Sequence, residues 1–309
     1  MNEFNLIEKY FNWTKLDSTT LGIGDDCALI SIQSKQQLAM SVDTLIEGVH
    51  FPINTSPADI AHKALSVNLS DLAAMGATPK FFTLALTLPE YNQVWLEEFS
   101  TSLKTLANRY KIDLIGGDTT KGRLSITINV TGVIDKNKAI LRSGAQVGDY
   151  IFVSNTLGDA ALAWRQLQQN KKPSENLLQQ FNRPQPQVEL GRALINIANS
   201  CIDISDGLEQ DLSHILDSSN VGARINMSDL PLSDELTTYI ENSYDWCLPL
   251  SGGDDYELCF TTNQENVRKV EMLEKRLNIR LTAIGVITKE LGLERLGMFD
   301  EECSSYQHF

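Results

Sequence analysis

Carboxylates beside glycine or serine recur at the ends of apolar segments along this chain, and they are the side chains best suited to chemistry. The first two are adjacent in the stretch LGIGDDCALI, ahead of an apolar run that we expect to form a buried strand. The full set comprises Asp25, Asp26, Asp43, Asp71, Asp118, Asp203, Asp206, Asp254, Asp255 and Glu257. Carboxylate oxygens suit hard divalent cations such as Mg²⁺, and neighbouring glycines let a ligand approach the backbone. No single motif is specific, but their recurrence together predicts magnesium–nucleotide chemistry.

Several of these acids also have a purely structural interpretation. Asp206 could cap a helix that begins at Gly207, with Glu209 completing a capping box, and this alternative is about as probable as a ligand role. Asp25 and Asp26 could be turn residues, because Asp tolerates turn geometry. Both alternatives stay open on the residues alone.

Asp71 is harder to explain as a surface residue. Ile60, Ala64, Val67 and Asp71 recur at helical spacing, so the carboxylate points with the apolar face of a helix. Burial of an unpaired charge costs several kcal/mol. We therefore expect a metal ion or another cation beside Asp71.

Alternating helical and strand segments must position these acids. The stretch SPADIAHKALSVNLSDLAAMG predicts a helix with Ser56 as N-cap, Pro57 at the first helical position, Asp59 at the third and Gly76 at its end. Strands are predicted at residues 38–42, 81–88 and 124–134, the last from the alternating pattern LSITINVTGVI.

A change in composition at residues 142–149, RSGAQVGD, marks a domain boundary. We predict two α/β domains, an N-terminal one at residues 1–145 and a C-terminal one at residues 146–309. In the second, Asp203 and Ser205 lie two apart in a strand-like run and therefore face the same way. The other predicted elements there are strands at 150–154, 201–205, 258–261 and 281–287, helices at 159–168 and 207–216, and a polar, Pro-rich bend at 171–186.

Composition limits the classes of function. The 309 residues are 42% hydrophobic, which allows a substantial core, and the net charge is −14. Nonspecific binding to nucleic acid or to an anionic membrane needs a basic surface, so the negative net charge argues against both kinds of binding. We expect small-molecule partners, with no nucleic acid and no membrane.

The cysteines and the apolar segments bear on the compartment. Five scattered cysteines without a CxxC pair predict reduced thiols. No segment approaches the roughly 18 consecutive apolar residues of a membrane span. Both observations predict a cytoplasmic protein.

Eight motifs, taken in order, resemble the thiamine-monophosphate kinase family of the aminoimidazole-ribonucleotide-synthetase-like ATP-binding superfamily. They are GIGDDCALI, SVDTLIEGVHF, KALSVNLSDLAAMGATP, LIGGDTT, RSGAQVGD, IDISDGLEQDL, SGGDDYELCF and YQHF, and they cover nearly the whole chain. The resemblance implies two mixed-sheet domains of an α+β or α/β fold. It also implies a homodimer in which the N-terminal domains form a joined β-barrel; an exposed apolar edge in LSITINVTGVI would be compatible with this.

The same resemblance assigns roles to individual residues. It implies magnesium ligands at Asp26, Ser41, Asp43, Asp71, Asp118, Asp203 and Asp206. It implies contacts to ATP, the co-substrate, at Gly117, Asp118, Arg142 and Ser205. It implies contacts to thiamine monophosphate at His50, Asp254 and Tyr306. The family has Glu where this chain has Asp254, so we expect that shorter side chain to keep the contact directly or through water.

The implied reaction is the phosphorylation of thiamine monophosphate by ATP to thiamine diphosphate and ADP, the last step of thiamine diphosphate biosynthesis. The chain carries neither a GxxxxGK[ST] motif nor the HRD and DFG motifs of protein kinases. A general base is not required, because a phosphate monoester with a second pKa of about 6 is mostly dianionic at neutral pH. We therefore expect direct in-line transfer without a phosphoenzyme.

Three alternatives remain at this stage. An amidine-forming ribonucleotide synthetase or a selenophosphate synthetase would share the fold and the acids, but not the monophosphate substrate. A calcium-binding structural module would explain scattered acids, although no DxDxDG loop with its distal Glu occurs. A catalytically inactive relative that only binds these ligands would differ from the kinase in turnover.

Overall fold

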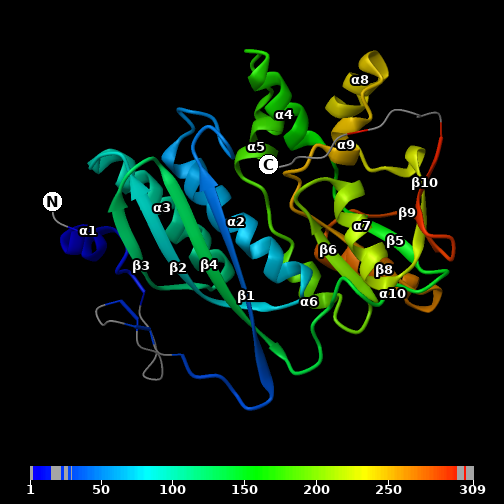
Figure 1. Ribbon diagram of the computed structural model, residues 1–309, viewed down its shortest axis with the longest axis horizontal. Helices are drawn as coiled ribbons and strands as arrows, with labels where there is room; N and C mark the ends of the chain where they lie inside the picture. Colours follow the sequence, from blue (N-terminus) through cyan, green and yellow to red (C-terminus); the bar gives the residue numbers. More distant parts are fainter. Residues whose placement is uncertain (1–2, 15–21, 24–26, 29, 298–302, 304–309) are drawn as a thin grey trace. The chain divides into compact units, whose positions relative to one another are not determined.

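The computed structural model describes residues 3–14, 22–23, 27–28, 30–297 and 303, and the chain divides into two compact units (Figure 1). One unit comprises Met1–Leu72 and Ala77–Asn137, and the other comprises Ala73–Gly76 and Lys138–Phe309. Each unit contains one mixed β-sheet with helices, as the predicted fold class requires. The predicted domain boundary between residues 145 and 146 stays a prediction.

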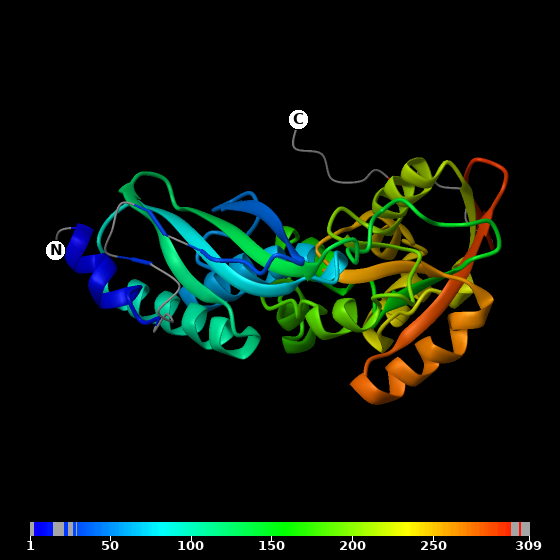
Figure 2. The ribbon, with the colours of Figure 1, turned by 90° about the horizontal axis from the view of Figure 1, so that it is seen from below.

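The first unit is built on a four-stranded sheet. Its elements are α1 (Glu3–Tyr10), β1 (Gln36–Ile46), α2 (Pro57–Ala74), β2 (Thr78–Leu88), α3 (Gln93–Tyr110), β3 (Asp113–Lys121) and β4 (Ser125–Asp135). The strand order is β1-β4-β2-β3, with β2 and β3 parallel and the other pairs antiparallel. In Figure 2, α1 and α3 lie on one side of this sheet.

Period-two alternation buries one face of this sheet, as the pattern LSITINVTGVI predicts. Ile126, Ile128 and Val130 on β4 are buried, whereas Thr127 and Asn129 between them are half-buried. On α2, every residue from 60 to 70 is buried, so this helix forms the centre of the unit. The predicted strand is confirmed, and its alternation holds as far as Val130, whereas residues 131–134 are all buried.

The start of α2 also follows its predicted signals. The backbone N–H of Asp59 donates to the Ser56 side chain at 3.1 Å, which makes Ser56 the N-cap, and Pro57 is the first helical residue. After the helix, Gly76 has a φ of +70°, in the left-handed region that glycine adopts readily. The predicted signals at the start and at the end of α2 therefore match the structure.

β1 lies at the edge of the sheet and pairs with β4 alone among the described strands. Leu38, Met40 and Val42 alternate along it on the face opposite to α2, with exposed fractions of 41%, 62% and 57%. Three exposed apolar side chains in a row at a strand edge form an unusual surface for a sheet.

The second unit is built on a six-stranded sheet with the order β10-β7-β9-β5-β8-β6. Its strands are β5 (Tyr150–Ser154), β6 (Ser200–Ile204), β7 (Gly222–Asn226), β8 (Glu257–Thr262), β9 (Leu281–Thr288) and β10 (Gly292–Leu296). Its helices are α4 (Asp159–Gln168), α5 (Glu175–Asn182), α6 (Val188–Ala193), α7 (Leu208–Ser219), α8 (Asp234–Ser243), α9 (Cys247–Ser251) and α10 (Gln264–Leu277), with a 3₁₀ turn η1 (Met227–Asp229). β10 and β7 are parallel, and the other pairs are antiparallel.

The amphipathic helix α7 supplies much of the core of this unit. Leu208, Leu212 and Ile215 recur at helical spacing and pack into one buried cluster with residues of β5, β6 and β9. The cluster fixes α7 against the end of β6, where the motif IDISDG turns from strand to helix.

Two local predictions are wrong. Residues 171–186 are not only a bend, because they contain α5, which begins at the N-cap Ser174 and buries Leu177 and Phe181. The apolar run after Asp26 is not a buried strand either: Cys27, the first of its residues, is exposed, and the described residues 27, 28 and 30 are in no strand.

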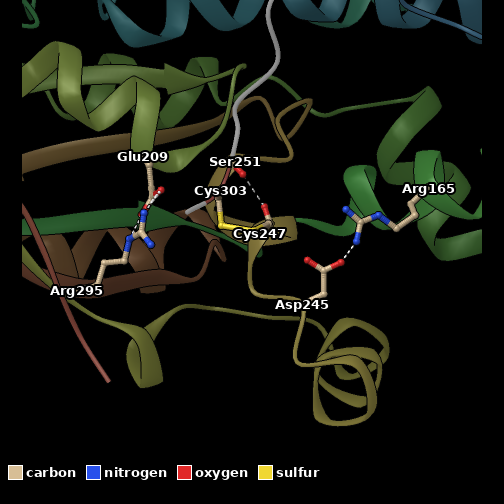
Figure 3. Close-up of a disulfide and its surroundings, with 7 residues drawn as sticks. All are labelled: Arg165, Glu209, Asp245, Cys247, Ser251, Arg295 and Cys303. Atoms are coloured by element: carbon tan, nitrogen blue, oxygen red, sulfur yellow. Dashed lines mark hydrogen bonds and ion pairs between the residues drawn. A yellow bond between two sulfur atoms is a disulfide. The ribbon is translucent and has the colours of Figure 1, made fainter. Parts of the chain in front are cut away.

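The prediction of uniformly reduced thiols is also wrong, because Cys247 and Cys303 form a disulfide (Figure 3). The two residues are 56 positions apart, but folding brings their Cα atoms to 5.3 Å, within the usual range for a disulfide. Cys27, Cys201 and Cys259 are free. Spacing along the sequence cannot reveal such a pair.

Within the described part of the chain, every helix is too short or too polar to cross a membrane.

Candidate functional site

Two predicted ligands meet where β1 faces α2 in the first unit. The hydroxyl of Ser41 donates a 2.6 Å hydrogen bond to Oδ2 of Asp71. Asp43 lies two residues further along β1, on the same face, and its backbone N–H donates to the Asn68 side chain at 3.2 Å. Ser41, Asp43 and Asp71 therefore form one group.

The electrostatics of this group favour a bound cation. Burial raises the pKa of Asp43 to about 7, and the neighbouring Asp71 carboxylate adds to the effect. Two carboxylates pressed together repel each other, and a cation between them relieves that repulsion. A cation beside Asp43 and Asp71 would stabilise the ionised carboxylates and so lower the pKa of Asp43.

These residues fit a magnesium ion. Every donor in the group is an oxygen, which Mg²⁺ prefers, and Mg²⁺ usually takes one or two carboxylates with water and phosphate oxygens completing its shell. Among the residues that the structure describes, no three His, Cys, Asp or Glu side chains form a metal-binding group. The first unit thus contributes a pair of carboxylates, and the predicted ligand Asp26 lies outside the described residues.

Asp118 is separate from this group. It pairs across the sheet with Ala85, which pairs with Thr127, which pairs with Thr44. Because directly opposed residues share a face, Asp118 faces as Thr44 does and not as Asp43 does. The structure therefore does not bring Asp118 together with the Ser41, Asp43 and Asp71 group.

Gly117 and Asp118 line a cavity of about 830 Å³ in the first unit, with Thr83 and Leu84 of β2 among its other walls. A Cβ atom at Gly117 would lie 1.9 Å from the Leu84 carbonyl oxygen. The glycine is therefore needed for the close approach of β3 to β2. The sequence pattern LIGGDTT hid this strand, because paired glycines are more typical of loops.

His50 has a local role in the turn that follows β1. Its Nδ1 accepts a 3.1 Å hydrogen bond from the backbone N–H of Ile46. An accepting Nδ1 places the proton of the neutral ring on Nε2.

In the second unit, the motifs DISDG and SGGDD form two turns in direct contact. The backbone N–H of Asp254 donates to the Ser205 carbonyl oxygen at 2.8 Å. A Cβ atom at Gly253 would lie 2.5 Å from that same oxygen, and one at Gly207 would lie 2.6 Å from the Cα of Ser251. Glycines permit this contact, which brings Ser205, Asp206 and Asp254 together.

Asp254 lies in a strained turn. Asp254 and Tyr256 have φ angles of 64° and 51°, in the region that non-glycine residues seldom adopt. The Tyr256 hydroxyl donates to Asp254 Oδ1 at 2.9 Å. Strained backbone of this kind is concentrated at functional sites.

The capping interpretation of Asp206 is wrong. Gly207 is the N-cap of α7, Asp206 Oδ2 accepts from Gln210 Nε2 at 2.8 Å, and Glu209 forms an ion pair with Arg295 (Figure 3). Asp211 Oδ2 instead accepts the backbone N–H groups of residues 205–207, in the turn that precedes α7. Burial raises the pKa of Asp211 to about 7, against the lowering effect of those hydrogen bonds.

Three further predicted residues, Asp203, Arg142 and Tyr306, belong to this unit. Asp203 is buried on β6 opposite Leu258 of β8. Arg142 is exposed, and its carbonyl oxygen accepts a 3.4 Å hydrogen bond from Ser219. Tyr306 lies outside the described residues.

Sequence analysis counted Asp255 and Glu257 among the recurring acids but assigned neither of them an individual role. Burial raises the pKa of Glu257 to about 8, although its oxygens accept hydrogen bonds from Ser154, Asn155 and Gln187. Burial also raises the pKa of Asp255 well above its ordinary value, while Oδ1 of Asp255 accepts the Gly158 N–H at 2.8 Å. Glu257 directly precedes the apolar run of β8, and this position in the sequence could have indicated a buried carboxyl.

Known proteins with similar sequences identify the family. Residues 24–134 match the model of the AIR synthase related protein N-terminal domain, and residues 146–295 match that of its C-terminal domain. A thiamine-monophosphate kinase of Haemophilus influenzae is 48% identical over 298 residues, covering 94% of this chain and 91% of the relative. The chain belongs to the thiamine-monophosphate kinase family.

Solved structures of the thiamine-monophosphate kinase family agree with this fold. The crystal structure of thiamine-monophosphate kinase from Stenotrophomonas maltophilia K279a has a TM-score of 0.86 at 43% identity and covers 91% of this chain and 92% of its own. AaThiL complexed with AMPPCP and TMP has a TM-score of 0.80 at 32% identity and covers 90% of this chain and 89% of its own. Both similarities span both units.

Proposed function

We propose that this chain phosphorylates thiamine monophosphate with ATP, giving thiamine diphosphate and ADP, the last step of thiamine diphosphate biosynthesis. The observation that carries this assignment is the 48% identity to a thiamine-monophosphate kinase over 94% of the chain. The complex of AaThiL with AMPPCP and TMP supports the same pair of ligands.

We assign magnesium to the carboxylates of both units. In the first, Ser41, Asp43 and Asp71 supply an all-oxygen group, and Asp26 and Asp118 are proposed as magnesium ligands apart from that group. In the second, Asp203 and Asp206 are the ligands. Bound magnesium supplies the positive charge that offsets the repulsion between phosphate groups and stabilises the group in transfer.

The remaining residues bind and orient the two substrates. Gly117 and Ser205 contact ATP, and Arg142 adds a positive charge for its phosphates. No residue is needed as a general base, because the attacking phosphate monoester is mostly dianionic at neutral pH. The protein accelerates direct in-line transfer by positioning and by electrostatics.

Thiamine monophosphate contacts His50, Asp254 and Tyr306 in this proposal. His50 offers the Nε2–H donor that its hydrogen bond to Ile46 defines. Asp254 is held in a strained turn by Tyr256, so its carboxylate is oriented before the substrate arrives.

We also propose a homodimer formed through the first unit. Leu38, Met40 and Val42 offer an exposed apolar row on an edge strand, which a second copy would cover in a joined β-barrel. Met40→Lys should shift the protein from dimer to monomer in analytical ultracentrifugation, whereas Ile53→Lys, at another exposed apolar residue of that unit, should not. A monomeric parent protein, or a dimeric Met40→Lys variant, would contradict this interface.

We place the reaction in the cytoplasm, where ATP is available. The cytoplasm is a reducing compartment, so the local redox balance there decides whether Cys247 and Cys303 form their disulfide or remain thiols. Fractionation of cells with an antibody against the chain tests this placement.

The first experiment is product formation from ATP, magnesium and thiamine monophosphate, with unphosphorylated thiamine as the control substrate and chromatographic separation of the products. Thiamine diphosphate should appear only from the monophosphate. Formation of ADP without thiamine diphosphate would instead favour one of the related synthetases, and the absence of turnover with intact ligand binding would favour an inactive relative.

A further inference from the structure

We propose that Asp211 is a positioning residue that holds the turn 205–207 in the shape that presents Ser205 and Asp206 to magnesium and ATP. The inference rests on the proposed function for the roles of those two residues. It assigns Asp211 an effect on ligand binding that goes beyond the stability of its own helix.

The contacts of one oxygen carry this proposal. Oδ2 of Asp211 accepts the backbone N–H groups of Ser205 at 2.9 Å, Asp206 at 3.0 Å and Gly207 at 3.2 Å. Successive N–H groups that converge in this way form an anion-binding concavity, and here the anion is the protein's own carboxylate. The side chain of Asp211 therefore sets the direction of three consecutive peptide groups.

The turn has little other support on its N–H side. Gly207 is the N-cap of α7 and has no side chain with which to cap it. The Asp206 carboxylate accepts from Gln210 instead of from the backbone. Without Asp211, the N–H groups of residues 205–207 would lose their shared acceptor.

The carbonyl side of the turn is held by the neighbouring motif. The N–H of Asp254 donates to the Ser205 carbonyl at 2.8 Å, and the N–H of Tyr256 donates to the Ile204 carbonyl at 2.7 Å. Both backbone groups of Ser205 are thus bound, one by Asp211 and one by Asp254. This arrangement fixes the direction of the Ser205 side chain and links the turn to the predicted substrate contact.

A stability role alone explains Asp211 poorly. A serine, threonine or asparagine at the N-cap would accept N–H groups of the first turn of α7, whereas Asp211 accepts those of residues 205–207, which precede α7. Asp211 is only 3% exposed and lies inside the first turns of α7. Burial of the Asp211 carboxylate costs free energy. Its hydrogen bonds hold the turn that carries Ser205 and Asp206.

The experiment compares Asp211→Asn and Asp211→Glu with the matched control Asp217→Asn, an exposed acid on the same helix. Calorimetry measures binding of the non-hydrolysable analogue AMPPCP with magnesium, and urea unfolding measures stability. Both Asp211 variants should bind magnesium–AMPPCP about 10- to 100-fold more weakly, the range seen when residues that orient metal ligands are removed. Binding of magnesium–AMPPCP by Asp217→Asn should stay unchanged.

Asp211→Glu keeps the charge and protects the test against misfolding, because its longer side chain retains acceptors but displaces the turn. Folded Asp211 variants that bind magnesium–AMPPCP like the parent protein would overturn the proposal and leave a purely structural role. A parent protein that binds magnesium–AMPPCP but does not phosphorylate thiamine monophosphate would instead overturn only the proposed function.

Discussion

The hydroxyl of Ser41 on β1 lies 2.6 Å from Oδ2 of Asp71 on α2 and donates a hydrogen bond to it. This bond joins the sheet to the helix beside a second carboxylate, that of Asp43. Burial raises the pKa of Asp43, and the Asp71 carboxylate beside it adds to the effect.

Removal of the Asp43 carboxylate separates function from stability. Asp43→Asn should lower kcat/KM by about 10²- to 10³-fold, as when one electrostatic contact in a transition state is lost. In magnesium-free buffer its melting temperature should equal or exceed that of the parent protein, because the repulsion with Asp71 is relieved. Turnover assays and thermal unfolding measure the two effects.

Asp135→Asn is the matched control for this variant, since Asp135 is exposed at the end of β4 in the same unit. It should change neither property. An Asp43→Asn enzyme with parental turnover would remove Asp43 from the set of metal ligands.

The metal ligands proposed from the family motifs should be individually essential. Asp206→Asn keeps an oxygen that can accept from Gln210, so folding should be preserved while turnover falls at least about 100-fold. Asp26→Asn, at a residue outside the described part, should have the same effect. Steady-state assays at saturating magnesium decide this, and near-parental activity in either variant would rule out its ligand role.

Stability should depend on pH through Glu257. Its pKa of about 8 in the folded protein lies above the ordinary value of 4.5, so folding favours the protonated carboxyl. The resulting stabilisation is complete below pH 4.5 and is lost as the pH rises through 8. Glu257→Gln should therefore reduce the loss of unfolding free energy between acidic and alkaline buffers by about 1 kcal/mol or more.

Urea unfolding across that pH range provides the measurement, with Glu241→Gln, at an exposed residue of α8, as the control. A parent protein whose stability does not fall toward alkaline pH, or a Glu257→Gln variant with the same pH profile, would show that Glu257 is ionised in the folded state.

The disulfide should stabilise the second unit. Cys247 and Cys303 close a loop with a sequence separation of 56 residues, and such a link typically contributes about 2–4 kcal/mol to the free energy of unfolding. Cys303→Ser and reduction of the parent protein should lower stability by the same amount. Cys27→Ser, at an exposed free thiol, should not. Equal stability of the parent protein with and without reductant would argue against the pair.

Local signals were sufficient for much of the fold. The capping residues Ser56 and Gly76 bound a helix that the structure confirms, and alternation along LSITINVTGVI identified a strand with one buried face. These local signals failed where the packing of the folded chain overrides the local preference for a loop or a bend. β3 contains Gly117 of LIGGDTT because β2 approaches it closely there, and α5 lies within a polar segment because two apolar residues reach the core.

The sequence by itself determined which residues are available for chemistry: recurring acids beside glycines, in an order typical of one enzyme family. Helical spacing even indicated that Asp71 points inward, because that depends only on the period of the helix. Tertiary structure decided which of these acids meet. The contact of Ser41 with Asp71, the three N–H groups on Asp211 and the Cys247–Cys303 pair all join residues through folding. Contacts of this kind depend on how helices, strands and turns pack, which spacing along a chain does not encode.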